Sequence, residues 1–129
     1  MFTIHKTDTG AVTPFEYMEA AAGDYEVGTF LRVREGKLTN NGEGDATVYL
    51  CMANKTVEDG ELIPVVRVND TMILKSTLSM ELMEGEGVGM NLDVSSYGTS
   101  VNQDGMGIGV VIVALEGIKN GDTVYVRLK

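Results

Sequence analysis

The chain of 129 residues contains one cysteine, one histidine and no tryptophan. A single cysteine excludes a disulfide within the chain, and with it the cross-linked scaffolds of small secreted proteins. One histidine and one cysteine cannot supply a standard zinc site, which needs three or four ligands. His5 lies near the N-terminus, and Cys51 lies in an apolar segment without a neighbouring positive charge. We therefore expect no catalytic residue and no metal site.

Positive charge is also scarce, because ten lysines and arginines are set against nineteen aspartates and glutamates, for a formal net charge of −9. Such a chain repels nucleic-acid phosphates and anionic lipids, so we expect no direct nucleic-acid partner and no membrane partner. The longest apolar run, residues 110–115, is far shorter than the ~20 residues that cross a bilayer. The N-terminal segment lacks the apolar core of a signal peptide, which predicts synthesis in a cytoplasm without secretion.

The acidic and glycine-rich segments do not match a known ligand-binding loop. No stretch of acidic residues has the spacing of a calcium-binding loop. Alternating glycines occur in residues 85–89 and 105–109, and both runs lead into predicted strands rather than into a helix N-terminus, where phosphate binds. Glycines at these positions favour a bend or a close backbone approach. We therefore expect no cofactor.

An internal repeat is the clearest pattern in the chain. Shifting the sequence by 61 residues superposes its two halves, about 25–68 and 86–129. The identical pairs include Val27-Gly28 with Val88-Gly89, Leu31 with Leu92, Val33 with Val94, Ala53 with Ala114, and Gly60 with Gly121. This repeat predicts two similar structural units in which Leu31, Val33, Leu92 and Val94 point into one shared core.

Each half contains three segments of alternating apolar residues bounded by glycine-containing turns, the pattern of antiparallel strands. The expected strands are 29–33, 47–53 and 62–68 in the first half, 91–94, 107–115 and 123–128 in the second, and a connecting strand at 71–79. We expect turns at 35–37, 59–60 and 120–121, and loops at 81–89 and around Tyr97-Gly98. The fold class is thus all-β: a small antiparallel barrel or sandwich over residues 23–129, built from two similar three-strand halves.

Residues 1–22 form an N-terminal arm in this prediction, either extended or ordered only against something else. Residues 14–22 are the one candidate helix, with Pro14 permitted in the first turn and Gly23 as the stop. A helix of this length is marginal on its own.

The order of these segments resembles that of the head decoration (cement) proteins of tailed bacteriophages and prophages. The run begins with a glycine, an apolar strand and a Gly-Lys-Leu turn in residues 25–39. It continues with a strand at 49–53, an acidic glycine turn at 57–60, and strands at 63–68 and 121–127. The likeness covers residues 14–128 as a loose pattern.

The resemblance implies a noncatalytic structural protein on the outer surface of an assembled icosahedral head, located on the virion and made in the host bacterial cytoplasm. It implies the major capsid protein as partner and a trimer as the common oligomer. We take Pro14, Phe15, Tyr17 and Met18 of the arm as candidate capsid-contacting residues. The alternative is a β-sandwich binding module for a glycan or peptide, for which five tyrosines and three phenylalanines are the available aromatic platforms.

Overall fold

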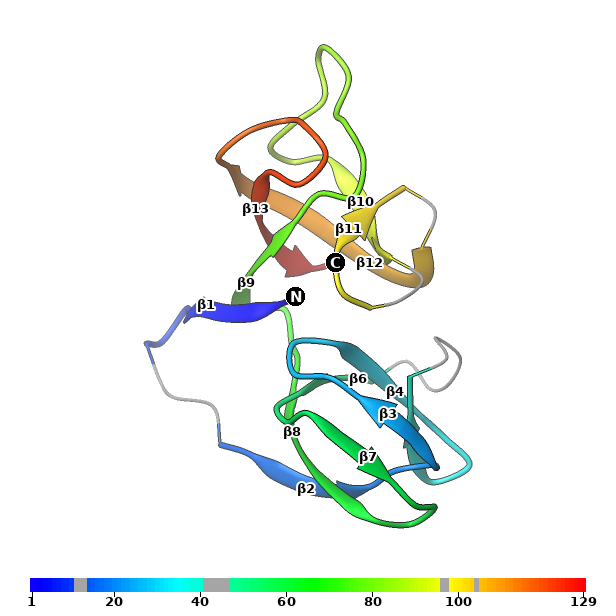
Figure 1. The fold of residues 1–129 in the computed structure, drawn as a ribbon. Helices are drawn as coiled ribbons and strands as arrows, with labels where there is room; N and C mark the ends of the chain where they lie inside the picture. The colour runs from blue at the N-terminus through cyan, green and yellow to red at the C-terminus, as the bar shows by residue number, and fades with distance from the viewer. Residues whose placement is uncertain (11–13, 41–46, 96–97, 104) are drawn as a thin grey trace.

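The computed structural model describes residues 1–10, 14–40, 47–95, 98–103 and 105–129. All regular secondary structure within these residues is β-strand (Figure 1). The strands are β1 (Thr3–Thr7), β2 (Glu16–Glu19), β3 (Gly23–Tyr25), β4 (Phe30–Arg34), β5 (Lys37–Thr39), β6 (Val48–Cys51), β7 (Lys55–Val57), β8 (Leu62–Arg67), β9 (Met72–Thr77), β10 (Asn91–Ser95), β11 (Val101–Asn102), β12 (Gly105–Leu115) and β13 (Thr123–Leu128). The expected all-β class is confirmed. The sheets are antiparallel and are not closed into a barrel, so the arrangement is sandwich-like.

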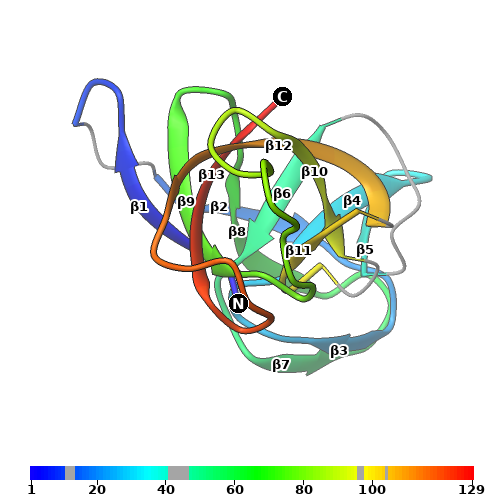
Figure 2. The ribbon, with the colours of Figure 1, turned by 90° about the horizontal axis from the view of Figure 1, so that it is seen from above.

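Two sheets make up most of the fold. The N-terminal sheet has the order β2-β8-β6-β4-β5, and the C-terminal sheet has the order β1-β9-β13-β12-β10-β11. Figure 1 shows the C-terminal sheet above the N-terminal sheet, with β1 at the level between them. Seen from above, the two sheets overlie one another (Figure 2). A third, two-stranded sheet of β3 and β7 contributes Tyr25 and Val57 to the core.

The internal repeat is present in the hydrogen-bonded register of the strands. Adding 61 to β4 and β8 gives the bounds of β10 and β13. The partner pair Leu31↔Tyr49 of β4 and β6 becomes the pair Leu92↔Val110 of β10 and β12, and both other pairs of β4 and β6 shift in the same way. All three pairs of β6 and β8 likewise become pairs of β12 and β13. The two halves therefore share one strand order and one register.

Strand β2, at the edge of the N-terminal sheet, also has an equivalent in β9, which lies next to β1 in the C-terminal sheet, at a slightly different offset. Glu16 of β2 is paired with Val65, and Leu74 of β9 is paired with Val126, the residue 61 positions after Val65. Strand β9 is thus the counterpart of β2 at an offset of 58. An isolated parallel bridge links Ala20 to Leu38 in the first half and Leu78 to Val101 in the second. Each repeat unit is therefore a curled five-stranded sheet.

Gly28 and Gly89 occupy equivalent turns and provide a matched test of the repeat. Their φ angles are 83° and 88°, and their N–H groups donate to the equivalent carbonyls of Cys51 and Ile112, each at 2.8 Å. A Cβ atom on Gly28 would lie 2.9 Å from the carbonyl oxygen of Phe2, whereas a Cβ atom on Gly89 meets nothing within 4 Å.

Gly89→Ala is therefore expected to cost only the left-handed backbone strain of an L-residue, about 1–2 kcal/mol of unfolding free energy. Gly28→Ala is expected to cost more, because the segment at Phe2 must also move. Urea denaturation of both variants measures the difference. Equal losses would show that the contact between Gly28 and Phe2 carries no energy.

The expected single core is wrong, because the apolar residues form two clusters. The small core lies on the inner face of the N-terminal sheet and contains Ala20, Tyr25, Leu31, Leu38, Tyr49, Cys51, Val57, Ile63 and Val65. The large core contains Leu92 and Val94 with the interior of the C-terminal sheet, and also Phe30, Leu50 and Val66 from the outer face of the N-terminal sheet. The N-terminal sheet thus buries apolar residues on both faces, and it separates Leu31 from Leu92.

The described parts of the expected arm, residues 1–10 and 14–22, are built into the fold, and the candidate helix at 14–22 is wrong. Strand β1 pairs with β9, Phe2 is buried in the large core, and β2 pairs with β8. Pairing with β8 and β9 satisfies backbone groups of these segments within larger sheets, whereas a helix of two turns is marginal on its own. In strand β2 the side chains alternate, so Met18 packs against the small core while Tyr17 faces outward.

Candidate interaction surface

The sequence-predicted contact residues lie on and beside β2, which is the edge strand of the N-terminal sheet. Pro14, Phe15 and Tyr17 are exposed, and the side chain of Phe15 is 54% and that of Tyr17 67% accessible. Met18 is partly buried against the small core and is therefore less available to a partner than predicted. The structure thus brings three of the four residues together at one exposed edge.

Leu62, which was not predicted from the sequence, belongs to the same surface. Leu62 is paired with Glu19 and Pro64 with Tyr17, so the side chains of all four residues point to the outer face of the sheet. Leu62 is 54% accessible. We call Phe15, Tyr17 and Leu62 the β2 ledge. The alternation of Leu62, Pro64 and Val66 in the sequence is the signal that would have placed Leu62 on the outer face.

The β2 ledge continues a face that is buried elsewhere. Phe30, Leu50 and Val66 lie on the same side of the N-terminal sheet, and all three pack in the large core against the C-terminal sheet. At the β2 edge this apolar face extends beyond that cover into solvent. Exposed apolar residues that cluster on a rigid sheet are typical of interaction sites.

The charges on β2 are both negative. Glu16 and Glu19 are exposed on the strand. The nearby Lys37 Nζ lies 2.6 Å from Asp59 Oδ2, and this hydrogen bond, followed by the charges of Asp59 and Glu19, raises the pKa of Lys37. Lys55 is similarly paired with Glu61 at 3.1 Å. The β2 edge therefore favours a partner that carries positive charge.

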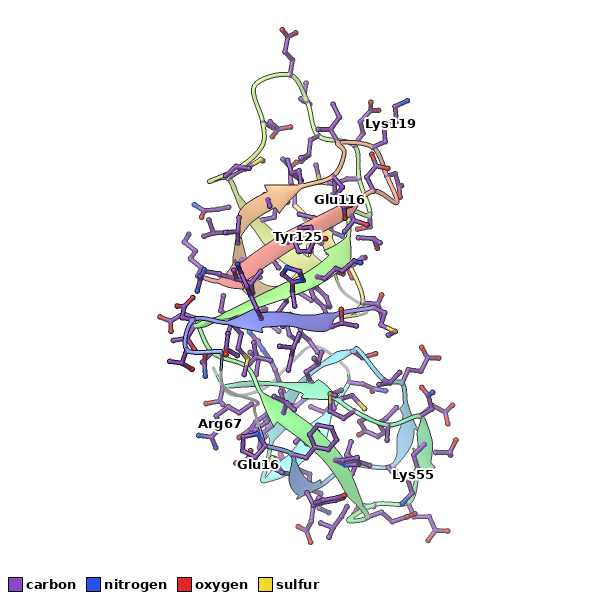
Figure 3. All side chains as sticks on the ribbon, turned by 90° about the vertical axis from the view of Figure 1, so that its left-hand side faces the viewer. Glu16, Lys55, Arg67, Glu116, Lys119 and Tyr125 are labelled. Atoms are coloured by element: carbon purple, nitrogen blue, oxygen red, sulfur yellow. The ribbon has the colours of Figure 1, made fainter. Side chains whose placement is uncertain are left out.

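The equivalent edge of the C-terminal sheet is covered by β1, which crosses between the sheets in Figure 3. The imidazole of His5 lies against the ring of Tyr125 with the centroids 4.7 Å apart. The hydroxyl of Tyr125 donates to Glu116 at 3.0 Å, and this bond raises the pKa of Tyr125. Strand β1 thus shields the face on which Tyr125 lies.

A bidentate ion pair holds the far end of β1. Arg127 Nη2 lies 2.6 Å from Asp8 Oδ1, and Nη1 donates to Asp8 Oδ2 at 3.0 Å. The hydrogen bond from Arg127 holds the pKa of Asp8 below its ordinary value. Asp8 is ionised at neutral pH, so its ion pair with Arg127 is present under ordinary conditions.

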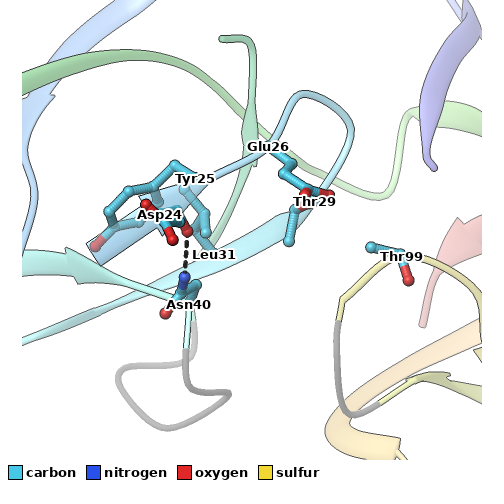
Figure 4. Close-up of a pocket in the computed structure, with 7 residues that line it drawn as sticks. All are labelled: Asp24, Tyr25, Glu26, Thr29, Leu31, Asn40 and Thr99. Atoms are coloured by element: carbon cyan, nitrogen blue, oxygen red, sulfur yellow. Dashed lines mark hydrogen bonds between the residues drawn. The ribbon is translucent and has the colours of Figure 1, made fainter. Parts of the chain in front are cut away.

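A hollow of about 460 Å³ opens at the end of the N-terminal sheet (Figure 4). Its lining residues are Asp24, Tyr25, Glu26, Thr29, Leu31, Asn40 and Thr99. The Asn40 amide donates to the carbonyl of Asp24 at 2.6 Å, and Tyr25 donates to the carbonyl of Ala21 at 2.7 Å. Burial raises the pKa of Tyr25. These polar groups are engaged in holding the local backbone together.

The single cysteine and the single histidine lie in different parts of the fold. Cys51 lies in the small core, where burial raises the pKa of its thiol, and His5 is exposed on β1. Of the residues that the structure describes, no three or more His, Cys, Asp or Glu side chains gather as a metal site would require. In the same part of the chain there is no helix with the length and apolarity to cross a membrane.

No known protein family and no curated protein sequence matches this chain.

Proposed function

We propose that the protein is a noncatalytic structural protein that binds the outer surface of an assembled phage head through the major capsid protein. The observation that carries the proposal is the β2 ledge, where Phe15, Tyr17 and Leu62 are exposed together on the edge of a rigid sheet. The order of the sequence segments, which resembles head decoration proteins, supplies the identity of the partner. The protein acts on the virion surface after synthesis in the host cytoplasm.

A trimer, the oligomer that the resemblance implies, would present three ledges to the capsid lattice at once. Each added contact then occurs at a high effective concentration, so modest individual interfaces suffice for stable binding. The acidic composition also fits an external position, since a net charge of −9 repels the nucleic acid inside the head.

Co-sedimentation with expanded heads of the cognate phage or prophage tests the proposal. Wild-type protein at micromolar concentration is expected to sediment with the heads. Tyr17→Ala combined with Phe15→Ala is expected to weaken binding at least about tenfold, because exposed aromatic residues dominate such interfaces. Point variants are required here, because removing residues 1–22 would also remove Phe2 and two strands from the fold.

Met83→Ala combined with Val88→Ala is the matched control. These residues are as exposed as the ledge, at 73% and 68%, but lie in the loop between β9 and β10. The control is expected to bind like wild type. Absence of co-sedimentation, together with specific retention on a glycan or peptide array, would instead establish the alternative binding-module function.

A further inference from the structure

The two repeat units differ in what covers their equivalent edges. In the C-terminal sheet, β1 pairs with β9, and Thr3 lies opposite Lys75 and Ile4 opposite Leu74. At the offset of 58, Lys75 corresponds to Tyr17 and Leu74 to Glu16. In the N-terminal sheet, β2 is the last strand and no described strand covers these positions. The edge of β9 is thus paired with a strand of the same chain, whereas the equivalent edge of β2 is open.

The backbone at Tyr17 points toward the open side. The N–H of Ala20 donates to Glu61 at the β8 side, whereas the N–H of Ala21 donates to Leu38 of β5 on the opposite side. Because backbone groups alternate along a strand, Tyr17 shares the direction of Ala21 and not that of Ala20. Pro64, which lies opposite Tyr17, has no N–H and uses its carbonyl to accept from Met52. The N–H and C=O of Tyr17 are therefore placed to pair with an added strand.

We propose that the edge of β2 at residues 15–17 accepts an antiparallel β-strand from a partner protein, as the edge of β9 accepts β1. Main-chain bonds to Tyr17 would hold the strand, and its apolar side chains would cover the β2 ledge. Basic side chains, which alternate with the apolar ones, would lie on the opposite face of the strand, where Glu16 is exposed. The proposal concerns the same surface as the proposed function and rests on it only for the identity of the partner.

A second copy of this chain is a poorer occupant than a basic strand. Pairing β2 with β2 of another copy would add two glutamates to each face of one short ladder, since each strand carries Glu16 on one face and Glu19 on the other. Like charges facing one another across strands are destabilising. Charged edge residues of this kind are a common device against self-association of sheet edges.

Binding of short peptides, followed by NMR on the intact protein, tests the proposal. The probe is a seven-residue peptide of alternating lysine and valine with blocked ends, and the control replaces each lysine by glutamate. The lysine peptide is expected to shift the resonances of residues 14–19 and of β8, and to slow hydrogen exchange of the Tyr17 amide at least about tenfold. The glutamate peptide is expected to do neither.

Tyr17→Pro tests the backbone contact directly. Proline removes the N–H that faces the open side and leaves the bonds of β2 to β8 in place, as proline on an edge strand permits. Peptide binding is expected to fall at least tenfold, and further than in Tyr17→Ala, which keeps the N–H. If Tyr17→Pro does not fold, Glu16→Lys serves instead and is expected to reverse the preference in favour of the glutamate peptide.

Resonance shifts confined to β11, unchanged binding by Tyr17→Pro, or dimerisation through β2 would each overturn strand addition. Peptide binding at β2 without co-sedimentation would sustain strand addition and reject the phage head as partner. If Tyr17→Ala and Tyr17→Pro weaken co-sedimentation equally, the side chain of Tyr17 matters and its N–H does not. That result would sustain the proposed function and reject strand addition.

Discussion

Phe30→Ala is expected to lower the free energy of unfolding by about 3–5 kcal/mol. The side chain of Phe30 is fully buried, and its ring stacks on that of Phe2 with the centroids 4.4 Å apart. It lies on the outer face of the N-terminal sheet, where that sheet meets the C-terminal sheet. Truncation therefore leaves a cavity at the junction between the two repeat units.

The control for Phe30 is its counterpart in the repeat. Asn91 occupies the same register 61 residues later, paired with Val111 as Phe30 is paired with Leu50, but it is exposed. Asn91→Ala is expected to change the unfolding free energy by less than about 0.5 kcal/mol. Urea denaturation with a common m-value measures both variants. A loss for Phe30→Ala as small as that for Asn91→Ala would show that the sheets do not pack through Phe30.

The contrast between these two positions extends across the outer faces of the sheets. Where the first unit has Val66 and Val68, both buried, the second has Arg127 and Lys129. The first unit therefore needs a neighbour on its outer face, and the second unit presents a polar face. If the outer face of the second unit were also apolar, further units could stack on it head to tail and form a filament. Its polar outer face disfavours the addition of a third unit.

The strands that the sequence predicted are those that supply most of the buried residues of the two cores. Expected segments match β4, β6, β8, β9, β10, β12 and β13, with bounds that differ by a few residues. The strands that were not predicted, β1, β2, β3, β5, β7 and β11, have five residues or fewer. Short edge strands form because a neighbouring strand offers bonds, and that neighbour lies far away in the sequence.

The division into two cores was not predicted, because alternation does not reveal what lies on each side of a sheet. Phe30 and Leu31 are adjacent and both fully buried, which means that β4 is covered on both faces. The repeat suggested that Leu31 and Leu92 share a core, since they are identical and in register. They are equivalent within their own units, and the units are stacked rather than facing one another.

The composition of the candidate surface could not be derived from the sequence for a similar reason. Phe15 and Tyr17, named from the sequence as contact residues, are both exposed, but the expected arm had no partner strand, so the sequence did not show which side chains share a face. Pairing of β2 with β8 creates the two faces, so that Met18 points inward and Leu62 joins the outward-facing residues.

The sequence also predicted a loop around Tyr97-Gly98. Tyr97 lies outside the described residues, and Gly98 is in a bend.

Leu31→Ala and Leu92→Ala are each expected to cost about 2–5 kcal/mol, because both leucines are buried, at 0% and 5% accessibility. Leu31 packs in the small core and Leu92 in the large core. Since the two clusters lie on opposite sides of the N-terminal sheet, the double variant is expected to lose the sum of the single losses within about 0.5 kcal/mol.

A double-mutant cycle by urea denaturation measures this coupling. Additive losses in one cooperative transition would mean that two separately packed cores unfold together, joined through the N-terminal sheet that they share. A coupling energy above about 1 kcal/mol would contradict the separation, since residues without shared partners do not interact so strongly. Two distinct transitions would show instead that each repeat unit folds on its own, with the outer face of the N-terminal sheet contributing little to holding them together.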